Sequence, residues 1–466
     1  MNTNHKSQIT NHKKICVIGL GYIGLPTSAL LANRGYDVHG VDVVQSTVDT
    51  INQGKIHIVE PELDIFVHAA VNSGKLKADT KPAEADIFVI AVPTPFHEGF
   101  VPNIDYVVSA TKAIAPYLKE GNIVILESTS PVGTTDKIEE ILSQERPELF
   151  GSEVISNSKL EIGENQPPIT NHQSPITKQK SKIFVSHCPE RVLPGHIMRE
   201  LVENDRIVGG TTPEATKLTA GFYREFVEGE VLETDAKTAE MAKLTENSFR
   251  DTNIAFANEL SMLCDKFDIN VWELIALANR HPRVNILQPG AGVGGHCIAV
   301  DPWFIVHAGG ETAKLIKTAR EVNNYKTEWV IEKIKNAVSN WKLENSNSSN
   351  QITNHKSPIT NHNPQITNHK SQITIKEPKV AVMGLAFKPD IDDLRESPAL
   401  YIARRLKADG VDVLAVEPNI ESHKEFEIVD YKEAIKEADI VTFLVAHKEF
   451  KKLDMKSELD FCGVLN

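Results

Sequence analysis

A cysteine followed four residues later by a carboxylate, within a glycine-rich stretch, is the strongest sign of chemistry in this sequence. In residues 289–302, Cys297 and Asp301 come just after a segment in which four of six positions are glycine. Glycine has no Cβ atom, so we expect a substrate to approach this backbone closely. If a helix starts here, its free N–H groups would stabilise a thiolate. The loop alone leaves two interpretations open, a nucleophile or a small buried apolar side chain.

A long segment without glycine or proline precedes this loop. Residues 236–267 are predicted to form one helix, on which polar residues recur at steps of three and four. A lysine and an asparagine four residues apart could hold an oxyanion, although such a stripe is also typical of a solvated helix side. The polar stripe consists of Glu240, Lys243, Asn247 and Arg250. The apolar residues, which favour a mostly buried helix, are Met241, Leu244, Phe249, Ile254, Phe256 and Leu260.

The N-terminal part of the chain carries a dinucleotide-binding pattern. An apolar strand over 14–18 leads into the motif G-x-G-x-x-G and then into a helix, and a second strand ends at Asp42, 18 positions after Gly24. This spacing is that of the carboxylate that binds the adenosine ribose. Asp42 would repel a 2′-phosphate and no cation occurs in 43–46, so NAD is favoured over NADP.

Loops after three further strands should line the same cleft, because the carboxyl ends of strands in a doubly wound sheet face the ligand. The strands 85–92 and 122–127 end in turns rich in proline, serine and threonine, and the strand 183–187 is followed by Glu190. Ordinary turns would have the same composition. The residues assigned to the cofactor are Gly19, Gly21, Tyr22, Ile23, Gly24, Asp42, Pro93, Thr94 and Thr129.

Composition limits the classes of partner. The 466 residues, 41% hydrophobic and 24% charged, are typical of a globular protein of about three domains. A net charge of −13 argues against nucleic acid and against anionic membranes. No signal peptide or run of ~18 apolar residues occurs, so a cytoplasmic protein is expected. The five cysteines contain no CxxC pair, so neither a disulfide framework nor a metal site is expected.

A heptapeptide repeat based on Ile-Thr-Asn-His interrupts the chain in three places. It has one apolar residue per heptad, with prolines and polar residues throughout, so we interpret it as disordered insertions and not as a coiled coil. The resulting plan is a repeat tail at 1–13, a dinucleotide-binding domain at 14–220 with an inserted repeat at 166–181, a central helical domain at 221–340, a linker at 341–376 and a C-terminal domain at 377–466.

The C-terminal domain has the pattern of a second, smaller βαβ domain. Strands are predicted at 380–385, 411–416 and 439–445, with a helix over 397–408. The glycine fingerprint is missing here. Lys388 and Arg395 follow the first strand and offer cations to an anionic group.

These features, taken in order, resemble the UDP-glucose/GDP-mannose dehydrogenase family. The resemblance rests on the dinucleotide fingerprint, the Lys/Asn helix, the G-G-x-C-x-x-x-D loop and the second Rossmann-like domain, and it covers nearly everything outside the repeats. It implies an α/β fold in which two Rossmann-like doubly wound domains are joined by a central helical dimerisation region. The stretches 127–133, 279–290 and 294–303 look most like the members that act on UDP-N-acetyl-D-mannosamine.

The resemblance also implies a reaction. The family oxidises the C6 alcohol of a nucleotide sugar to a carboxylate with two NAD⁺ and one water, supplying precursors for surface polysaccharides. Lys243 and Asn247 would stabilise the developing oxyanion. Cys297 would form a thiohemiacetal and then a thioester.

Further roles follow from the same resemblance. Glu190 would be the base for thioester hydrolysis, with Thr129 and Asp301 orienting the water. The family forms a homodimer through its central helices, and Arg280 or Arg283 would reach the partner's site. The implied substrate-binding residues are Arg191, Lys243, Asn247, Arg250, Arg280, His281, Arg283, Gly294, Lys388 and Arg395.

Three competing functions are left open. A two-electron dehydrogenase would share the fold plan but would not need Cys297. A non-catalytic nucleotide-sugar-binding protein would bind both ligands without turnover. A relative that acts on UDP-N-acetylglucosamine, UDP-glucose or GDP-mannose is the nearest rival.

Overall fold

The segments that contain the heptapeptide repeat lie mostly outside the part of the chain that the structure describes. The computed structural model describes residues 13–152, 179–193, 195–295, 297–349, 377–457 and 459–465. The chain forms two units, which are treated separately below: Met1–Thr245 with Trp303–Gly310, and Glu246–Pro302 with Glu311–Asn466. The predicted disorder of the tail, of the insertion up to residue 178 and of the linker from residue 350 therefore stays a prediction.

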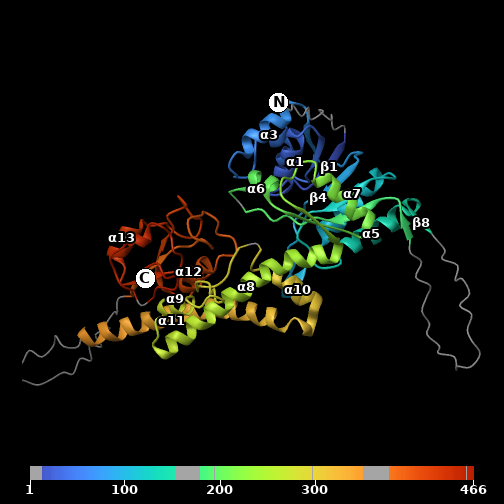
Figure 1. Cartoon of the computed structure of the whole chain (residues 1–466). Coiled ribbons are helices and arrows are strands. Elements are labelled where there is room, and N and C mark those ends of the chain that lie inside the picture. The colour runs from blue at the N-terminus through green and yellow to red at the C-terminus, as the bar shows by residue number, and fades with distance from the viewer. Residues whose placement is uncertain are drawn as a thin grey trace, which may run out of the picture. The chain divides into compact units, whose positions relative to one another are not determined.

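The first unit is built on a sheet to which β1 and β4 belong (Figure 1). In the described residues this sheet has eight strands, in the order β12-β11-β10-β7-β4-β1-β2-β3. Within this sheet, β3, β2, β1, β4, β7 and β10 pair parallel, whereas β11 pairs with β10 antiparallel. The order β3-β2-β1-β4-β7-β10 is that of a doubly wound dinucleotide-binding fold, as the glycine pattern predicts. The strands are β1 Lys14–Ile18, β2 Asp37–Val41, β3 Leu76–Asp79, β4 Ile87–Ile90, β7 Ile123–Leu126, β10 Phe184–His187, β11 Arg206–Gly210 and β12 Val231–Asp235.

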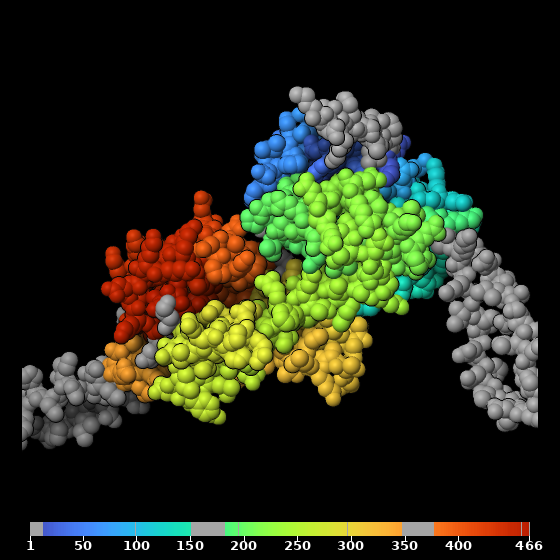
Figure 2. All heavy atoms as spheres, viewed as in Figure 1, coloured from blue at the N-terminus to red at the C-terminus, as the bar shows by residue number. Residues whose placement is uncertain are grey.

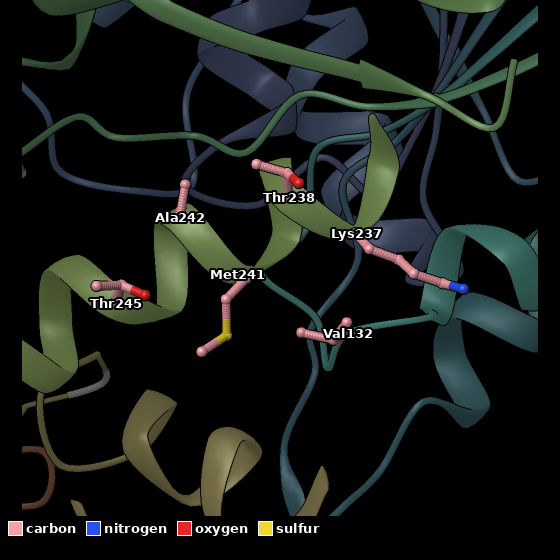
Figure 3. Close-up of a pocket in the computed structure, with 6 residues that line it drawn as sticks. All are labelled: Val132, Lys237, Thr238, Met241, Ala242 and Thr245. Carbon is pink, nitrogen blue, oxygen red and sulfur yellow. The ribbon is translucent and has the colours of Figure 1, made fainter. Parts of the chain in front are cut away.

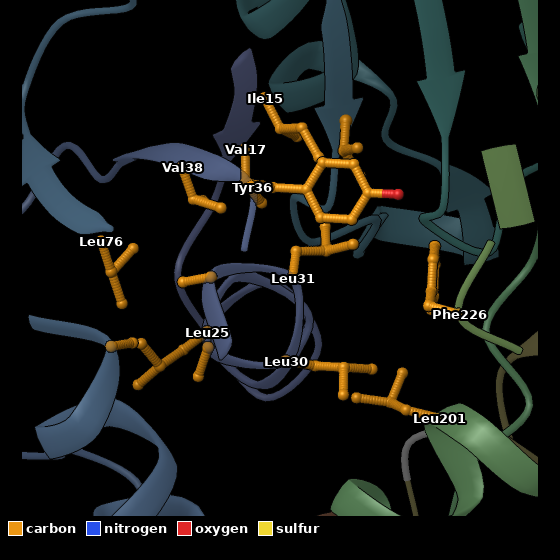
Figure 4. Close-up of a cluster of buried hydrophobic side chains, with 14 of the residues drawn as sticks. Ile15, Val17, Leu25, Leu30, Leu31, Tyr36, Val38, Leu76, Leu201 and Phe226 are labelled. Atoms are coloured by element: carbon orange, nitrogen blue, oxygen red, sulfur yellow. The ribbon is translucent and has the colours of Figure 1, made fainter. Parts of the chain in front are cut away.

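Helices cover both faces of this sheet, because its central strands are apolar on both sides. On one face, Ile15 and Val17 of β1 pack with helices α1, α3, α6 and α7, and Figure 4 shows Leu30 and Leu31 of α1 within this cluster. On the other face, Cys16 packs with α4 and α5. The helices are α1 Gly24–Asn33, α2 Gln45–Asn52, α3 Leu63–Asn72, α4 Asp105–Ile114, α5 Thr134–Glu145, α6 Ile197–Glu203 and α7 Pro213–Tyr223.

Two short hairpins complete the first unit. One pairs β5 (Phe96–His97) with β6 (Val101–Pro102), and the other pairs β8 (Phe150–Ser152) with β9 (Gln179–Ser181). Residues 179–181 were expected to belong to the disordered insertion. That boundary is wrong, because these residues have a backbone partner in β8.

The second unit contains a smaller parallel sheet, with the strand order β14-β13-β15 in the described residues. Its core joins β13 to α12 and α11, and residues 377–465 form one continuous body in Figure 2 (orange to red). The predicted C-terminal βαβ domain is present. The elements are α9 Val271–Ala278, α11 Lys314–Ser349, β13 Lys379–Met383, α12 Pro398–Ala408, β14 Asp412–Val416, α13 Tyr431–Glu437 and β15 Ile440–Phe443.

Helix α8 (Ala236–Phe267) has the predicted bounds, but most of the apolar residues that favoured a mostly buried helix are not buried. Of the six apolar residues expected inside, only Leu244 is buried, while Phe249 is 69% and Phe256 is 56% exposed. Of the polar stripe, Glu240 and Asn247 are buried, Lys243 is half-buried and Arg250 is exposed. In the described residues no helix is both long and apolar enough to cross a membrane.

Hydrogen bonds join the second half of α8 to α11 within the second unit. Asp251 is fully buried and its Oδ1 accepts hydrogen bonds from Arg320 Nη1 at 2.6 Å and Asn323 Nδ2 at 2.8 Å. The Asn323 side chain in turn accepts a bond from Asn258 Nδ2 at 2.9 Å. Buried polar groups must be paired, so these bonds fix one register between the helices.

Two predicted domain boundaries differ from the structure. The boundary at residue 220 falls inside α7, and β12 extends the first sheet to Asp235. The linker predicted from residue 341 begins with helix, because α11 continues to Ser349.

Candidate active site

The turn between β1 and α1 has the geometry of a dinucleotide-binding loop. Gly19 has a φ of +94°, and a Cβ there would lie 2.4 Å from the carbonyl oxygen of Ala91. A Cβ on Gly24 would lie 1.8 Å from the carbonyl oxygen of Gly19, whereas one on Gly21 would have nothing within 4 Å. The first and third glycines therefore allow close packing, and the second faces open space where a diphosphate can approach the helix N-terminus.

Asp42 lies at the end of β2 and is held beside this turn. Its Oδ2 accepts a hydrogen bond from the backbone N–H of Leu20 at 3.1 Å, and its Oδ1 accepts one from Val44 at 3.0 Å. Asp42, which is predicted to bind the ribose, is thus hydrogen-bonded to the loop that is predicted to bind the diphosphate. Tyr22 is 39% exposed beside them.

The loops after β4 and β7 also meet, as predicted from their place at the sheet edge. Thr94 donates its hydroxyl proton to the carbonyl oxygen of Thr129 at 2.6 Å. Ser128 donates to the carbonyl oxygen of Val92 at 2.7 Å. These residues fit NAD, which when bound supplies a hydride acceptor at this edge of the sheet.

Glu190 is not a solvated base in this structure. Its Oε2 accepts a hydrogen bond from Arg206 Nη1 at 2.5 Å, and its Oε1 accepts the backbone N–H groups of Arg191 at 2.6 Å and Val192 at 3.0 Å. The side chains of Glu190 and Arg206 are 5% and 2% exposed. A carboxylate has about four lone-pair sites, so one acceptor position of Glu190 is still available.

Three buried residues that we did not single out from the sequence belong to the same cluster: Glu127, Arg206 and Tyr223. Tyr223 donates its phenol proton to Glu127 Oε1 at 2.6 Å. Burial, followed by the negative charge of Glu190, raises the pKa of Glu127 to about 7. A sequence signal could have identified two of these residues, because each is a charged residue at the end of a buried strand: Glu127 follows β7 and Arg206 begins β11.

The cysteine loop lies in the second unit and joins α10 (Asp301–Gly309) as predicted. The backbone N–H of Asp301 donates to the carbonyl oxygen of Cys297 at 2.8 Å, which closes one helical turn. Asp301 is 3% exposed and its Oδ2 accepts a hydrogen bond from Asn247 Nδ2 at 2.6 Å. Cys297 itself is exposed. One aspartate therefore links the predicted nucleophile to the predicted oxyanion donor.

The glycines before Cys297 are required by packing. A Cβ on Gly294 would lie 2.3 Å from the carbonyl oxygen of Glu396, and one on Gly295 would lie 2.9 Å from the ring of Phe387. The sequence suggested that these glycines give access to a substrate. In the structure they let the loop lie against the C-terminal domain, next to the segment that carries Lys388 and Arg395.

The predicted substrate-binding cations have different surroundings. Lys388 and Arg395 are exposed, and Arg395 makes an ion pair with Asp393 with a shortest distance of 2.6 Å. Arg280, His281 and Arg283 are exposed after α9, and Arg191 donates from Nη1 to the carbonyl oxygen of Asp205 at 3.3 Å.

The predicted catalytic residues are divided between the two units. The first unit holds Thr129, Glu190 and Lys243, and the second holds Asn247, Cys297 and Asp301. Within the second unit, hydrogen bonds join Asp301 to the side chain of Asn247 and to the backbone of Cys297. The sequence predicted that all six act on one substrate, and this stays a prediction.

A pocket of about 580 Å³ opens beside α8 but contains none of the predicted site residues. Figure 3 shows Val132 of the loop after β7 and Met241 of α8 among its lining side chains. Lys237, at one end, is ion-paired with Asp136. The lining offers no convergent polar groups, so we do not assign the cofactor to it.

Ionisation of Glu127 should destabilise the fold. The folded protein keeps this proton up to about pH 7, whereas the unfolded chain loses it near the ordinary value of 4.5. The destabilisation therefore grows between these values and is complete above pH 7. Glu127→Gln should raise the free energy of unfolding by up to about 3 kcal/mol at pH 8 and by much less at pH 5.

Denaturant unfolding at the two pH values tests this. The exposed Glu145, also changed to glutamine, serves as a matched control and should show no such pH dependence. A Glu127→Gln protein that is equally or less stable than the wild type at pH 8 would contradict the assignment of a protonated acid.

Comparison with known proteins agrees with this geometry. The sequence matches three models of the UDP-glucose/GDP-mannose dehydrogenase family: its NAD binding domain over residues 13–227, its central domain over 237–325 and its UDP binding domain over 381–461. The boundary between the first two models agrees with the end of the first sheet better than residue 220 does.

Similar proteins span nearly the whole chain. A UDP-N-acetyl-D-mannosamine dehydrogenase from Campylobacter jejuni is 52% identical over 96% of this chain and 99% of its own length. An NDP-N-acetyl-D-galactosaminuronic acid dehydrogenase from Ralstonia nicotianae is 50% identical over 95% of this chain and 92% of its own. The structure of a UDP-N-acetyl-mannosamine dehydrogenase from S. aureus is similar with a TM-score of 0.73 and 40% identity, covering 94% of this chain and 90% of that one. The chain therefore belongs to the UDP-glucose/GDP-mannose dehydrogenase family, and it is an NAD-dependent nucleotide-sugar dehydrogenase.

Proposed function

We propose that this enzyme oxidises the C6 alcohol of UDP-N-acetyl-D-mannosamine to the carboxylate. The observation that carries the proposal is the position of Asp301, which holds Asn247 through its side chain and Cys297 through its backbone. A nucleophile and an oxyanion donor held together suit a reaction that passes through an aldehyde and a covalent thioester. Relatives named UDP-N-acetyl-D-mannosamine dehydrogenase support the choice of sugar.

The chain's own residues would act in sequence. NAD, when bound, accepts the hydride in both oxidations. Lys243 and the second amide hydrogen of Asn247 stabilise the oxygen as the alcohol loses its proton. The Cys297 thiol adds to the aldehyde as a thiohemiacetal, whose oxidation gives a thioester. Water then cleaves the thioester, releasing the carboxylate and the Cys297 thiol.

Glu190 is proposed as the base for this hydrolysis, with Thr129 and Asp301 orienting the water. The donors from Arg206, Arg191 and Val192 would hold its carboxylate in one orientation. The water would then use the one acceptor position that these donors leave.

Cys297→Ser should abolish acid formation while NAD still binds. Serine does not form an alkoxide at neutral pH as readily as cysteine forms a thiolate, so the covalent step should slow by a factor on the order of 10³ or more. The measurements are uronic acid formed per sugar and NAD affinity. An unchanged acid yield and rate would remove the cysteine from the mechanism.

UDP-N-acetyl-D-mannosamine should have the highest kcat/KM in a panel of nucleotide sugars and yield about two NADH per sugar, as the thioester route requires. The epimeric acetamido groups have the same donors and acceptors and differ in direction. A rigid pocket that leaves a polar group unpaired with the wrong epimer can discriminate by ~10⁴-fold.

The panel should include UDP-N-acetylglucosamine, UDP-N-acetylgalactosamine, UDP-glucose and GDP-mannose. Preference for another sugar would overturn the substrate and leave the family standing. One NADH per sugar would favour a two-electron dehydrogenase, and no NADH with any sugar would favour a binding protein.

We further propose a homodimer through α8. Phe249, Phe256 and Leu263 recur every seven residues and are 69%, 56% and 42% exposed, while polar residues of α8 are buried. Large exposed apolar stripes are typical of association surfaces. Arg280 and Arg283, one of which is proposed to reach the partner's site, are exposed in this chain.

Phe256→Asp should weaken the dimer by roughly 30-fold or more, since an aromatic side chain at an interface centre commonly contributes ~2 kcal/mol. Analytical ultracentrifugation measures the dissociation constant. Ile65→Asp is a matched control, because Ile65 is 66% exposed on α3. A wild type that is monomeric at micromolar concentration, or a Phe256→Asp protein as dimeric as wild type, would contradict the proposed surface.

A further inference from the structure

Glu240 connects α8 to the loop that carries Thr129. It is 0% exposed, and its Oε2 accepts a hydrogen bond from the backbone N–H of Gly133 at 2.6 Å. Its Oε1 accepts the backbone N–H of Thr135 at 2.8 Å and the Thr135 hydroxyl at 2.6 Å. All these residues belong to the first unit.

These three hydrogen bonds to Glu240, here called the bridge, replace a local helix cap. Helix α5 has Gly133 as its N-cap residue, with a φ of +94°, and glycine has no side chain to accept from the first N–H groups. Glu240 supplies that acceptor from a position 105 residues away along the chain. A carboxylate at a helix N-terminus also interacts favourably with the helix dipole and makes charge-assisted hydrogen bonds. The end of this loop thus depends on α8.

The beginning of the same loop is attached to the loop that follows β4. Thr94 holds the carbonyl oxygen of Thr129, and Ser128 donates to the carbonyl oxygen of Val92. The loop therefore spans from the sheet edge to α8. Lys243 lies three residues after Glu240, on neighbouring positions of one helix side.

We propose that Glu240 is a positioning residue that fixes the relative placement of Thr129 and Lys243. This rests on the proposed roles of those two residues in the oxidation. Rotation of α8 or movement of the loop by about 1 Å would misplace one group relative to the other, and such errors can cost ~10²-fold in rate.

Two variants remove different parts of the bridge. In Glu240→Gln the amide NH₂ group cannot accept a hydrogen bond. The backbone N–H that it faces, that of Gly133 or that of Thr135, therefore loses its acceptor. Thr135→Val removes only the hydroxyl contact. We expect kcat to fall by ~10- to 100-fold for Glu240→Gln and by a few-fold for Thr135→Val, with KM for the UDP-sugar within ~3-fold.

Hydrogen exchange at the amides of Gly133 and Thr135 provides a second measurement that needs no turnover. The amide that loses its acceptor, either Gly133 or Thr135, should exchange at least ~10-fold faster in Glu240→Gln. Asp460→Asn is a control for simple loss of stability, because Asp460 accepts backbone N–H groups of the C-terminal segment, including Gly463 at 2.8 Å. It should lower the thermal midpoint without changing kcat or these two amides.

Unchanged exchange in Glu240→Gln would show that the bridge does not order the loop. Faster exchange with a kcat within twofold of wild type would make Glu240 merely structural, and either result overturns the proposal. If Glu240→Gln does not fold, Thr135→Val decides through kcat, and a kcat equal to that of the wild type would overturn the proposal. If the wild type oxidises none of the sugars, the proposed function fails, and the exchange measurement still tests the bridge.

Discussion

The burial of polar side chains along α8 is the constraint on which the rest of the structure depends. A buried carboxylate or amide without a partner costs free energy, so each of these groups must find a donor or acceptor. Glu240 finds Gly133 and Thr135 in the first unit. Asn247 finds Asp301 in the second, where Asn258 accepts the backbone N–H of Gly290.

Each partner belongs to a segment that carries a candidate residue. Glu240 holds the loop of Thr129, Asn247 holds the start of α10, and Asn258 holds the chain shortly before Cys297. An apolar face would allow these segments to slide along the helix, because hydrophobic contacts are not directional. Hydrogen bonds between buried groups have one satisfactory arrangement, so α8 sets the position of each segment within its own unit.

Buried ionisable groups at the edge of the first sheet are a second feature that costs folding free energy. Glu127 and Glu190 both lie close to the Arg206 guanidinium, and burial raises the pKa of Glu127. Nearby, burial lowers the pKa of His187 to about 3, so this residue is neutral at physiological pH. Perturbed groups of this kind cluster at functional sites, and here they lie next to the loop that presents Glu190.

The sequence alone determined the features that depend on neighbours in the chain: the glycine turn before α1, the apolar strands, the bounds of α8 and the helical turn from Cys297 to Asp301. It did not determine which side of α8 lies inward, why Gly294 and Gly295 are needed, or that Arg206 holds Glu190. These depend on residues such as Thr135 and Phe387 that are distant in the sequence. Periodicity identifies two faces of a helix, but only the tertiary structure decides which face is buried, because that choice depends on the partners available to its polar groups.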